Sequence, residues 1–345
     1  MPKSQQSSSS ASPGAVTLAL AGDVMLGRLV RNRIRERGYA YPWGDILPEI
    51  AEADLFLVNL ECVLSAQTAR WFGREAKQFH FRADPDMVAV LKAGGVDCVS
   101  LANNHIGDFG LDGLLDTIRA LDRASISHAG AGSDLAAARA PARLRARGRQ
   151  VAVIAAADYP PPWAACLAEP GMHFLAIPPE EDELVPLLEA IRVERTRSDH
   201  LILSLHWGYN MCERPPAEFR GFAHRMLEAG VDVIWGHSAH LPQAVELADQ
   251  KLILYDTGDL IDDYVVDPAL RNDLSAVFLI TLGTRGVERL EVIPIQIAEQ
   301  QARLARGEAA AWITSRIAKL SAEIHTTLCP EDNHLILRPA GAGAP

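Results

Sequence analysis

Carboxylate, amide and imidazole side chains follow apolar segments of this sequence at five places, and together they could bind metal ions. The polar residues at the ends of these segments are Gly22-Asp23, Asn59-Leu60-Glu61, Asn103-Asn104-His105, His206 and Gly236-His237-Ser238-Ala239-His240. This mixture of oxygen and nitrogen ligands suits Zn²⁺, Mn²⁺, Fe or related divalent ions. The set is large enough for two ions. A carboxylate such as Glu61 can bridge a pair of ions about 3.5–4 Å apart, which activates water and binds a substrate oxygen.

Short buried strands are needed to bring these side chains together. Seven apolar runs predict such strands, at residues 16–21, 54–60, 96–101, 150–156, 200–205, 231–235 and 251–255. Between them, residues 111–123, 180–195 and 217–229 have apolar residues at helical spacing. This alternation predicts a layered α/β architecture with largely parallel strands. Functional residues collect beyond the carboxyl ends of such strands, so we expect the polar residues to lie at one edge of the predicted sheet.

The ends of the chain differ from this central pattern. Residues 1–14 are Ser-rich and predict a disordered leader, and residues 15–296 are expected to form a single domain. Within it, residues 276–282 and 287–294 are separated by a short Gly-containing connection, which predicts a hairpin and therefore mixed sheets. Residues 297–345 predict a C-terminal extension of one or two helices around Gly307, followed by a Pro- and Gly-rich tail.

Composition excludes several classes of protein. The 345 residues carry 33 Lys and Arg against 44 Asp and Glu, a net charge of −11, which disfavours general binding to nucleic-acid phosphates. No apolar run approaches the roughly 20 residues of a membrane-spanning helix. The five cysteines are scattered and form no CxxC pair, which is typical of a reducing compartment, so we expect a cytoplasmic protein.

Seven segments, in this order along the chain, resemble the successive motifs of the CapA family. They are GDVMLGR (22–28), NLECVLS (59–65), SLANNHIGDFG (100–110), SHAGAG (127–132), LHWG (205–208), GHSAHLPQ (236–243) and YDTGDL (255–260). The resemblance covers about residues 16–265. It implies an association with capsule or poly-γ-glutamate synthesis. It also implies a fold similar to the calcineurin-like metallophosphoesterases, a layered α-β-β-α sandwich.

The resemblance also implies a role for each residue of the site. Asp23 and His240 are expected to bind the first ion, Glu61 to bridge, and Asn104, His206 and His237 to bind the second ion. His105 would then face the substrate as a general acid or electrostatic stabiliser. The wider superfamily has a His where this chain has Met25, and a Gly-Asp pair where it has Asn59-Leu60-Glu61. We therefore expect the first ion to be bound weakly.

Two further residues complete the predicted site. Arg28 follows Asp23 by about one helical turn and could hold a substrate carboxylate through two hydrogen bonds. Asp108 is expected to support His105. The remaining candidates His128, Asp256 and Asp259 are left outside the predicted ligand set.

The sequence leaves three functions open. The preferred one is a soluble, divalent-metal-dependent hydrolase that cleaves an amide, ester or phosphoester in a peptide or polyglutamate-like substrate. The second is a metal-dependent peptide Cα epimerase, since some CapA-like proteins of lasso-peptide pathways are such epimerases. The third is a metal-binding subunit of a poly-γ-glutamate or capsule synthase without turnover of its own. The oligomeric state is left open as well.

Overall fold

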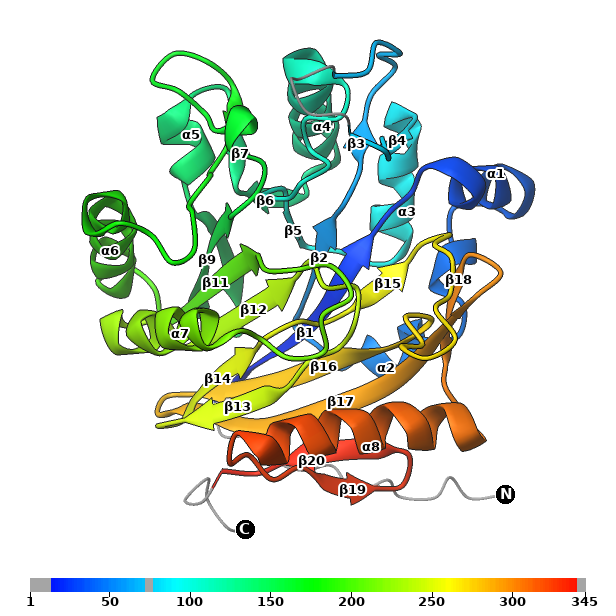
Figure 1. The fold of residues 1–345 in the computed structure, drawn as a ribbon, viewed down its shortest axis with the longest axis vertical. Coiled ribbons are helices and arrows are strands. Elements are labelled where there is room, and N and C mark those ends of the chain that lie inside the picture. Colours follow the sequence, from blue (N-terminus) through cyan, green and yellow to red (C-terminus); the bar gives the residue numbers. More distant parts are fainter. Residues whose placement is uncertain (1–13, 72–76, 340–345) are drawn as a thin grey trace.

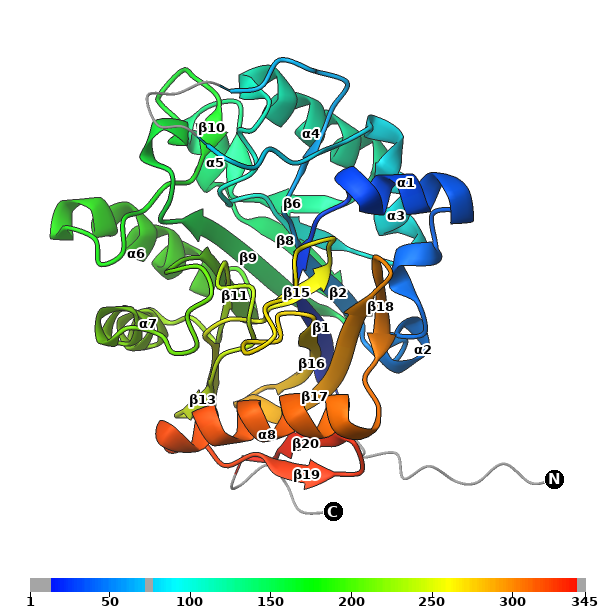
Figure 2. The same cartoon turned by 45° about the vertical axis from the view of Figure 1, so that its right-hand side comes forward.

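Two β-sheets face each other in the computed structural model, which describes residues 14–71 and 77–339 (Figure 1). Helices α6 (Glu181–Arg195) and α7 (Ala217–Ala229) lie outside one sheet (Figure 2). Helices α1 (Arg28–Arg37), α3 (Val88–Ala93) and α4 (Gly110–Ala124) lie on the side of the other sheet. The layered, mixed α/β fold expected from the sequence is therefore confirmed. Except for Gly14, the predicted leader lies outside the described residues.

The larger sheet has ten strands, of which the parallel ones supply site residues. Its parallel part contains β1 (Val16–Val24), β2 (Leu55–Leu60), β5 (Cys98–Ser100) and β6 (Ser127–Ala129), with β15 (Asp259–Ile261) also parallel to β1. On the other side of β1 the strands are antiparallel: β16 (Leu274–Gly283), β17 (Gly286–Ala298), β18 (Gln301–Leu304), β20 (His334–Leu337) and β19 (Cys329–Glu331). The predicted hairpin is the β16–β17 pair.

The second sheet has six strands with a parallel centre. Its order is β13 (Val245–Ala248), β14 (Lys251–Leu254), β12 (Val233–His237), β11 (His200–His206), β9 (Arg149–Ala157) and β8 (Ala142–Ala146), and the two outer strands are antiparallel to their neighbours. Two short pairs lie apart from the main sheets: β3 (Val63–Leu64) with β4 (Arg82–Ala83), and β7 (Ala131–Gly132) with β10 (Gly171–Met172).

Strand β1 of the larger sheet and strand β12 of the smaller sheet contact each other in the core between the sheets. Trp235 of β12 is fully buried there, and its indole Nε1 donates a hydrogen bond of 3.1 Å to the carbonyl oxygen of Ala21 on β1. A buried indole needs such an acceptor, so this contact links the sheets and fixes one strand against the other. As a result, the end of β1, which has Asp23, lies beside the end of β12, which has His237.

The structure corrects two expectations about organisation. The strand ends with polar residues do not share one sheet edge, because β1, β2 and β5 belong to the larger sheet while β11 and β12 belong to the smaller one. Of the predicted extension, residues 340–345 lie outside the described residues, and residues 297–339 differ from a purely helical segment. They contain the end of β17 and one long helix, α8 (Gly307–Glu323), and strands β18, β19 and β20 of the larger sheet. β20 pairs directly with β17, so this segment is part of the main fold.

The remaining helices are short. They are α2 (Leu47–Ile50), α5 (Leu135–Arg139) and the 3₁₀ turns Tyr41–Trp43, Pro85–Met87 and Pro161–Trp163. In the part of the chain that the structure describes, no helix combines the length and the apolar character that crossing a bilayer requires.

Candidate metal centre

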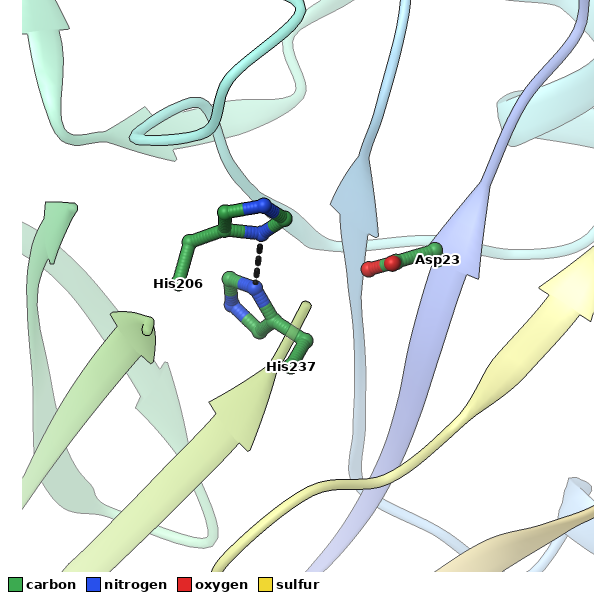
Figure 3. A group of neighbouring side chains, drawn as sticks. All are labelled: Asp23, His206 and His237. Carbon is green, nitrogen blue, oxygen red and sulfur yellow. Dashed lines mark hydrogen bonds between the residues drawn. The ribbon is translucent and has the colours of Figure 1, made fainter. Parts of the chain in front are cut away.

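The ends of strands from both sheets meet at one buried cluster. Asp23 lies one residue before the end of β1, and Glu61 directly follows β2. His206 and His237 are the last residues of β11 and β12, and these two positions pair in register. Figure 3 shows the Asp23 carboxylate directed toward the two imidazole rings. The larger sheet thus supplies the carboxylates and the smaller sheet supplies these imidazoles.

Two overlapping groups of side chains are close enough to share an ion. Asp23, His206 and His237 form one group, and Asp23, Glu61, His240 and Asp259 form the other; in each, one potential ligand atom per residue lies within 4.8 Å of the others. Asp23 belongs to both groups. Asp259 is outside the ligand set predicted from the sequence, yet β15 places it opposite Asp23 in the parallel register. The only sequence signal for Asp259 was the DTGD run after a predicted strand.

Several potential ligand atoms are buried without a hydrogen-bond partner among the described residues. These atoms are Asp23 Oδ2, Glu61 Oε1, Asn104 Oδ1, His206 Nε2 and Asp259 Oδ2. Burying charged or polar atoms in this way costs free energy unless something compensates them. Oxygen and imidazole nitrogen atoms are also the ligands that divalent transition ions accept. The residues present therefore fit a divalent metal ion.

Hydrogen bonds from neighbouring residues hold the other polar atoms of this cluster. Asn59 Nδ2 donates to Asp23 Oδ1 (2.7 Å), and the Tyr264 hydroxyl donates to Glu61 Oε2 (2.8 Å). Ser204 Oγ and His237 Nε2 share a hydrogen bond of 2.8 Å, and His240 Nδ1 lies 2.8 Å from Asp259 Oδ1 and 3.4 Å from Asp23 Oδ2. Such contacts orient metal ligands. Nδ1 of His237 lies 2.9 Å from Nδ1 of His206, the contact drawn as a dashed line in Figure 3, while Nε2 of His206 has no partner among the described residues.

Burial changes the protonation of the cluster. It raises the pKa of Glu61 well above the ordinary value, and the charge of Asp23 adds to this effect. Burial lowers the pKa of His237 to about 4 despite the opposing charge of Asp23, and burial together with His237 lowers the pKa of His206 well below its usual range. Both imidazoles are consequently neutral near pH 7, which is the form that binds metals.

Met25 belongs to neither group. Its side chain is buried, and its sulfur accepts a hydrogen bond of 3.0 Å from the backbone N–H of Gly27. The position that has a His in the wider superfamily is thus occupied by a side chain that supports the turn before α1. Asp259 is grouped with Asp23, Glu61 and His240 instead.

His105 lies in a hydrogen-bonded arrangement beside the cluster. Its Nδ1 is 2.7 Å from Asp108 Oδ2, and its ring stacks on Phe81 at a centroid distance of 4.0 Å. Burial lowers the pKa of His105 to about 4, although the charge of Asp108 opposes this shift. Asp108 also accepts a hydrogen bond from Lys77. The sequence did not predict this contact, because Lys77 is distant from Asp108 in the chain and belongs to no motif.

Arg28 lies near Asp263 and near two aromatic rings, one of which is Phe81. Its Nε is 3.3 Å from Asp263 Oδ1, and its side chain is 39% exposed. Its guanidinium lies 5.5 Å from the ring centre of Phe81, which stacks on His105, and 5.9 Å from that of Phe79.

The other candidates have local structural contacts. Asp256 accepts hydrogen bonds of 2.7 Å from the N–H groups of Ala239 and Gly258. These bonds fix the residue before His240 and the residue before Asp259, the first residue of β15. His128, on the edge strand β6, has its Nε2 3.1 Å from Asp122 Oδ1.

The fold and the buried cluster define a two-sheet α/β sandwich protein with a candidate metal centre. A family model described as bacterial capsule synthesis protein PGA_cap matches residues 17–264, and the chain belongs to that family. The resemblance to CapA proteins noted in the sequence is thereby confirmed.

Individual relatives agree with this assignment. A probable polyglutamine synthesis accessory protein of Mycobacterium tuberculosis is 30% identical, over 90% of this chain and 92% of the relative. The capsule biosynthesis protein CapA of Bacillus anthracis is 27% identical, over 82% of this chain and 68% of the relative. Among solved structures, the purple acid phosphatase PPD1 from yellow lupin covers 85% of this chain and 54% of its own, with 8% identity and a TM-score of 0.36. A likeness that low carries no argument about activity.

Proposed function

We propose that this protein is a divalent-metal-dependent hydrolase that acts on a peptide-like or polyglutamate-like substrate. The observation that supports this proposal best is the convergence of buried, unpartnered ligand atoms from both sheets on one point. A cluster of that kind is costly unless a cation compensates it. The relatives named for polyglutamine synthesis and capsule biosynthesis support the substrate class. A cytoplasmic location, expected from the cysteine pattern, is part of the same proposal.

The two groups of side chains would hold the metal. Asp23, His206 and His237 would form one position, and Asn104, whose Oδ1 is buried without a partner among the described residues, is proposed as a further ligand there. Glu61, His240 and Asp259 would form the other together with Asp23. A divalent ion bound here supplies positive charge, which polarises a carbonyl or phosphoryl oxygen and lowers the pKa of water.

His105 is proposed as the residue that moves a proton. Its Nδ1 faces the Asp108 carboxylate, which leaves Nε2 as the ring nitrogen available to a substrate. Because the low pKa keeps the ring neutral near pH 7, Nε2 would first accept a proton and then give it to the leaving group. Asp108 would stabilise the imidazolium that forms between these two steps.

Arg28 is proposed to bind a carboxylate of the substrate. It is partly exposed at the rim and lies over the aromatic ring that stacks on His105. A guanidinium in that place matches a carboxylate in geometry and charge. Polyglutamate has such a group at each residue, which agrees with the proposed substrate class.

Turnover assays of the metal-loaded protein test this function. γ-Glutamyl peptides, α-linked peptides and a phosphodiester are incubated with the wild type and with Glu61→Ala, in ordinary and in deuterated water. We expect metal-dependent cleavage of one class by the wild type and loss of it in the variant. Deuterium at Cα without cleavage would show an epimerase instead, and binding of γ-glutamyl chains without turnover would show a subunit that only binds.

A further inference from the structure

The ammonium group of Lys77 lies in a polar cluster that the proposed chemistry does not yet use. Its Nζ donates to Asp108 Oδ1 and to the backbone carbonyl oxygen of Asn104, and it lies 3.2 Å from Nδ1 of His105. The side chain is only 18% exposed, and Asp108 is fully buried. A buried ion pair with further hydrogen bonds has a defined geometry, unlike an exposed lysine.

These contacts join both ends of one loop. Asn104 and Asp108 are four residues apart in the segment after β5, and His105 lies between them. His105 N–H donates to Asn103 Oδ1 (3.0 Å), and Asn103 Nδ2 donates to Asn59 Oδ1 (3.1 Å) and to the Leu60 carbonyl (2.9 Å). Asn103 therefore fixes the start of the loop to the end of β2. Lys77 links Asn104, near the start of the loop, to Asp108 at its end.

An aromatic ring also lies against the ammonium group of Lys77. Nζ lies 4.6 Å from the ring centre of Trp163, and Trp163 packs edge-on against Trp71 at 5.4 Å. A cation over an aromatic face is stabilised there, more strongly when it is shielded from water. Lys77 is thus held from one side by the ring and from the other by the Asn104–Asp108 loop.

These contacts determine which ring nitrogen of the neutral His105 side chain is protonated. Asp108 is an acceptor to Lys77 at Oδ1 and to the Phe81 N–H at Oδ2 (2.6 Å), so it is arranged as an ionised carboxylate. An ammonium has no lone pair and a carboxylate has no proton to give. The 2.7 Å contact between Asp108 Oδ2 and His105 Nδ1 consequently requires a proton on Nδ1.

We propose that Lys77 is a positioning residue that fixes the Asn104–Asp108 loop and holds His105 in its Nδ1–H tautomer. Nε2 then has its lone pair free to accept a proton from the reaction. Lys77 acts through Asp108 and His105 and does not touch the substrate. This inference rests on the proposed role of His105 in turnover, but its structural half can be measured without any substrate.

The structural half is tested by ¹⁵N NMR of histidine-labelled protein without added metal. The His105 signals are assigned by their loss in His105→Asn. We expect the Nδ1–H tautomer in the wild type, and in Lys77→Met a shift toward a mixture of tautomers, because Asp108 and Asn104 have lost a donor. Lys92→Met removes an exposed lysine from α3 and should leave the spectrum unchanged. An unaltered His105 tautomer in Lys77→Met would overturn the proposal.

The kinetic half compares kcat with KM. Loss of positioning should lower kcat of Lys77→Met by about 10²-fold and change KM by less than about threefold. Lys77→Arg keeps the charge beside Asp108, so it should retain the wild-type tautomer and a higher kcat than the Met variant. If Lys77→Met does not fold, an Arg variant that folds but has lost the tautomer contradicts the proposal. If Lys77→Met shows the tautomer shift but the wild type turns over no substrate, the positioning role is supported and the proposed hydrolase function is contradicted.

Discussion

Nε2 of His206 lies 4.0 Å from Oε1 of Glu61, and neither atom has a hydrogen-bond partner in the described part of the chain. One residue ends a strand of the smaller sheet and the other follows a strand of the larger sheet. The facing sheets thus leave a donor atom from each side directed at the same space. A divalent ion at this place would compensate both atoms.

Tyr264→Phe should weaken metal binding while keeping the fold. The hydroxyl donates to Glu61 Oε2, whereas the ring stacks on Phe81 with centroids 5.5 Å apart, and Phe keeps that packing. Removing a hydrogen bond to a ligand typically costs about 10–100-fold in affinity. Calorimetric titration with Mn²⁺ measures the change. Tyr209→Phe is the control, since Tyr209 is 67% exposed, and equal affinities in the two variants would refute the role of Tyr264.

His105→Asn should reduce turnover without loss of metal. A positioned proton-transfer group contributes about 10²–10⁴-fold, so we expect kcat to fall by that factor at unchanged metal content. Elemental analysis gives the metal content and steady-state kinetics give kcat, both on the same sample. The control is His128→Asn. His128 lies on the edge strand β6 and contacts Asp122 of α4, so this variant should have the wild-type kcat. Full turnover in His105→Asn would show that His105 has no catalytic role.

Asp158 should make stability depend on pH. Burial raises its pKa to about 6, against the hydrogen bond of 2.9 Å from the Gly208 N–H. The folded state therefore binds the proton more tightly than the unfolded state, so stability is lost as the pH rises from about 4 to about 6. Asp158→Asn avoids this loss, which is at most about 3 kcal/mol.

Thermal unfolding checks this prediction. The variant should have a higher Tm than the wild type near pH 7.5 and a nearly equal one near pH 3, because the wild-type carboxyl is then largely protonated in both states. A Tm difference that is the same at both values of pH would contradict the assignment to Asp158.

Local sequence patterns were sufficient for the elements and most of the cluster. The run before Asp23 is apolar except for Thr17 and forms the largely buried strand β1. The run before His206 is mostly apolar and forms β11, which is buried along its whole length. The polar residue after each run could then be assigned to a strand end. Such an assignment depends only on neighbours in the chain, and the structure has Asp23, Glu61, His206 and His237 at strand ends.

The parts that failed depend on contacts between distant segments. No local pattern indicates that β1 and β11 belong to different sheets, since both are buried apolar runs. Asp259 begins a three-residue strand whose position is set by pairing with β1, and Tyr264 and Lys77 reach Glu61 and Asp108 from loops. The individual ligand roles, the number of ions and the weak first ion stay predictions.

Equilibrium dialysis of the chelator-treated protein against Mn²⁺ or Zn²⁺ tests the central claim most directly. The wild type should bind at least one ion per chain. Glu61→Ala and His206→Ala, which remove the two facing donors, should each lose affinity by more than about 10-fold, since changes that only disturb a ligand's orientation already cost that much. A wild type that binds neither ion, or variants that bind both ions as tightly as the wild type, would contradict the metal centre.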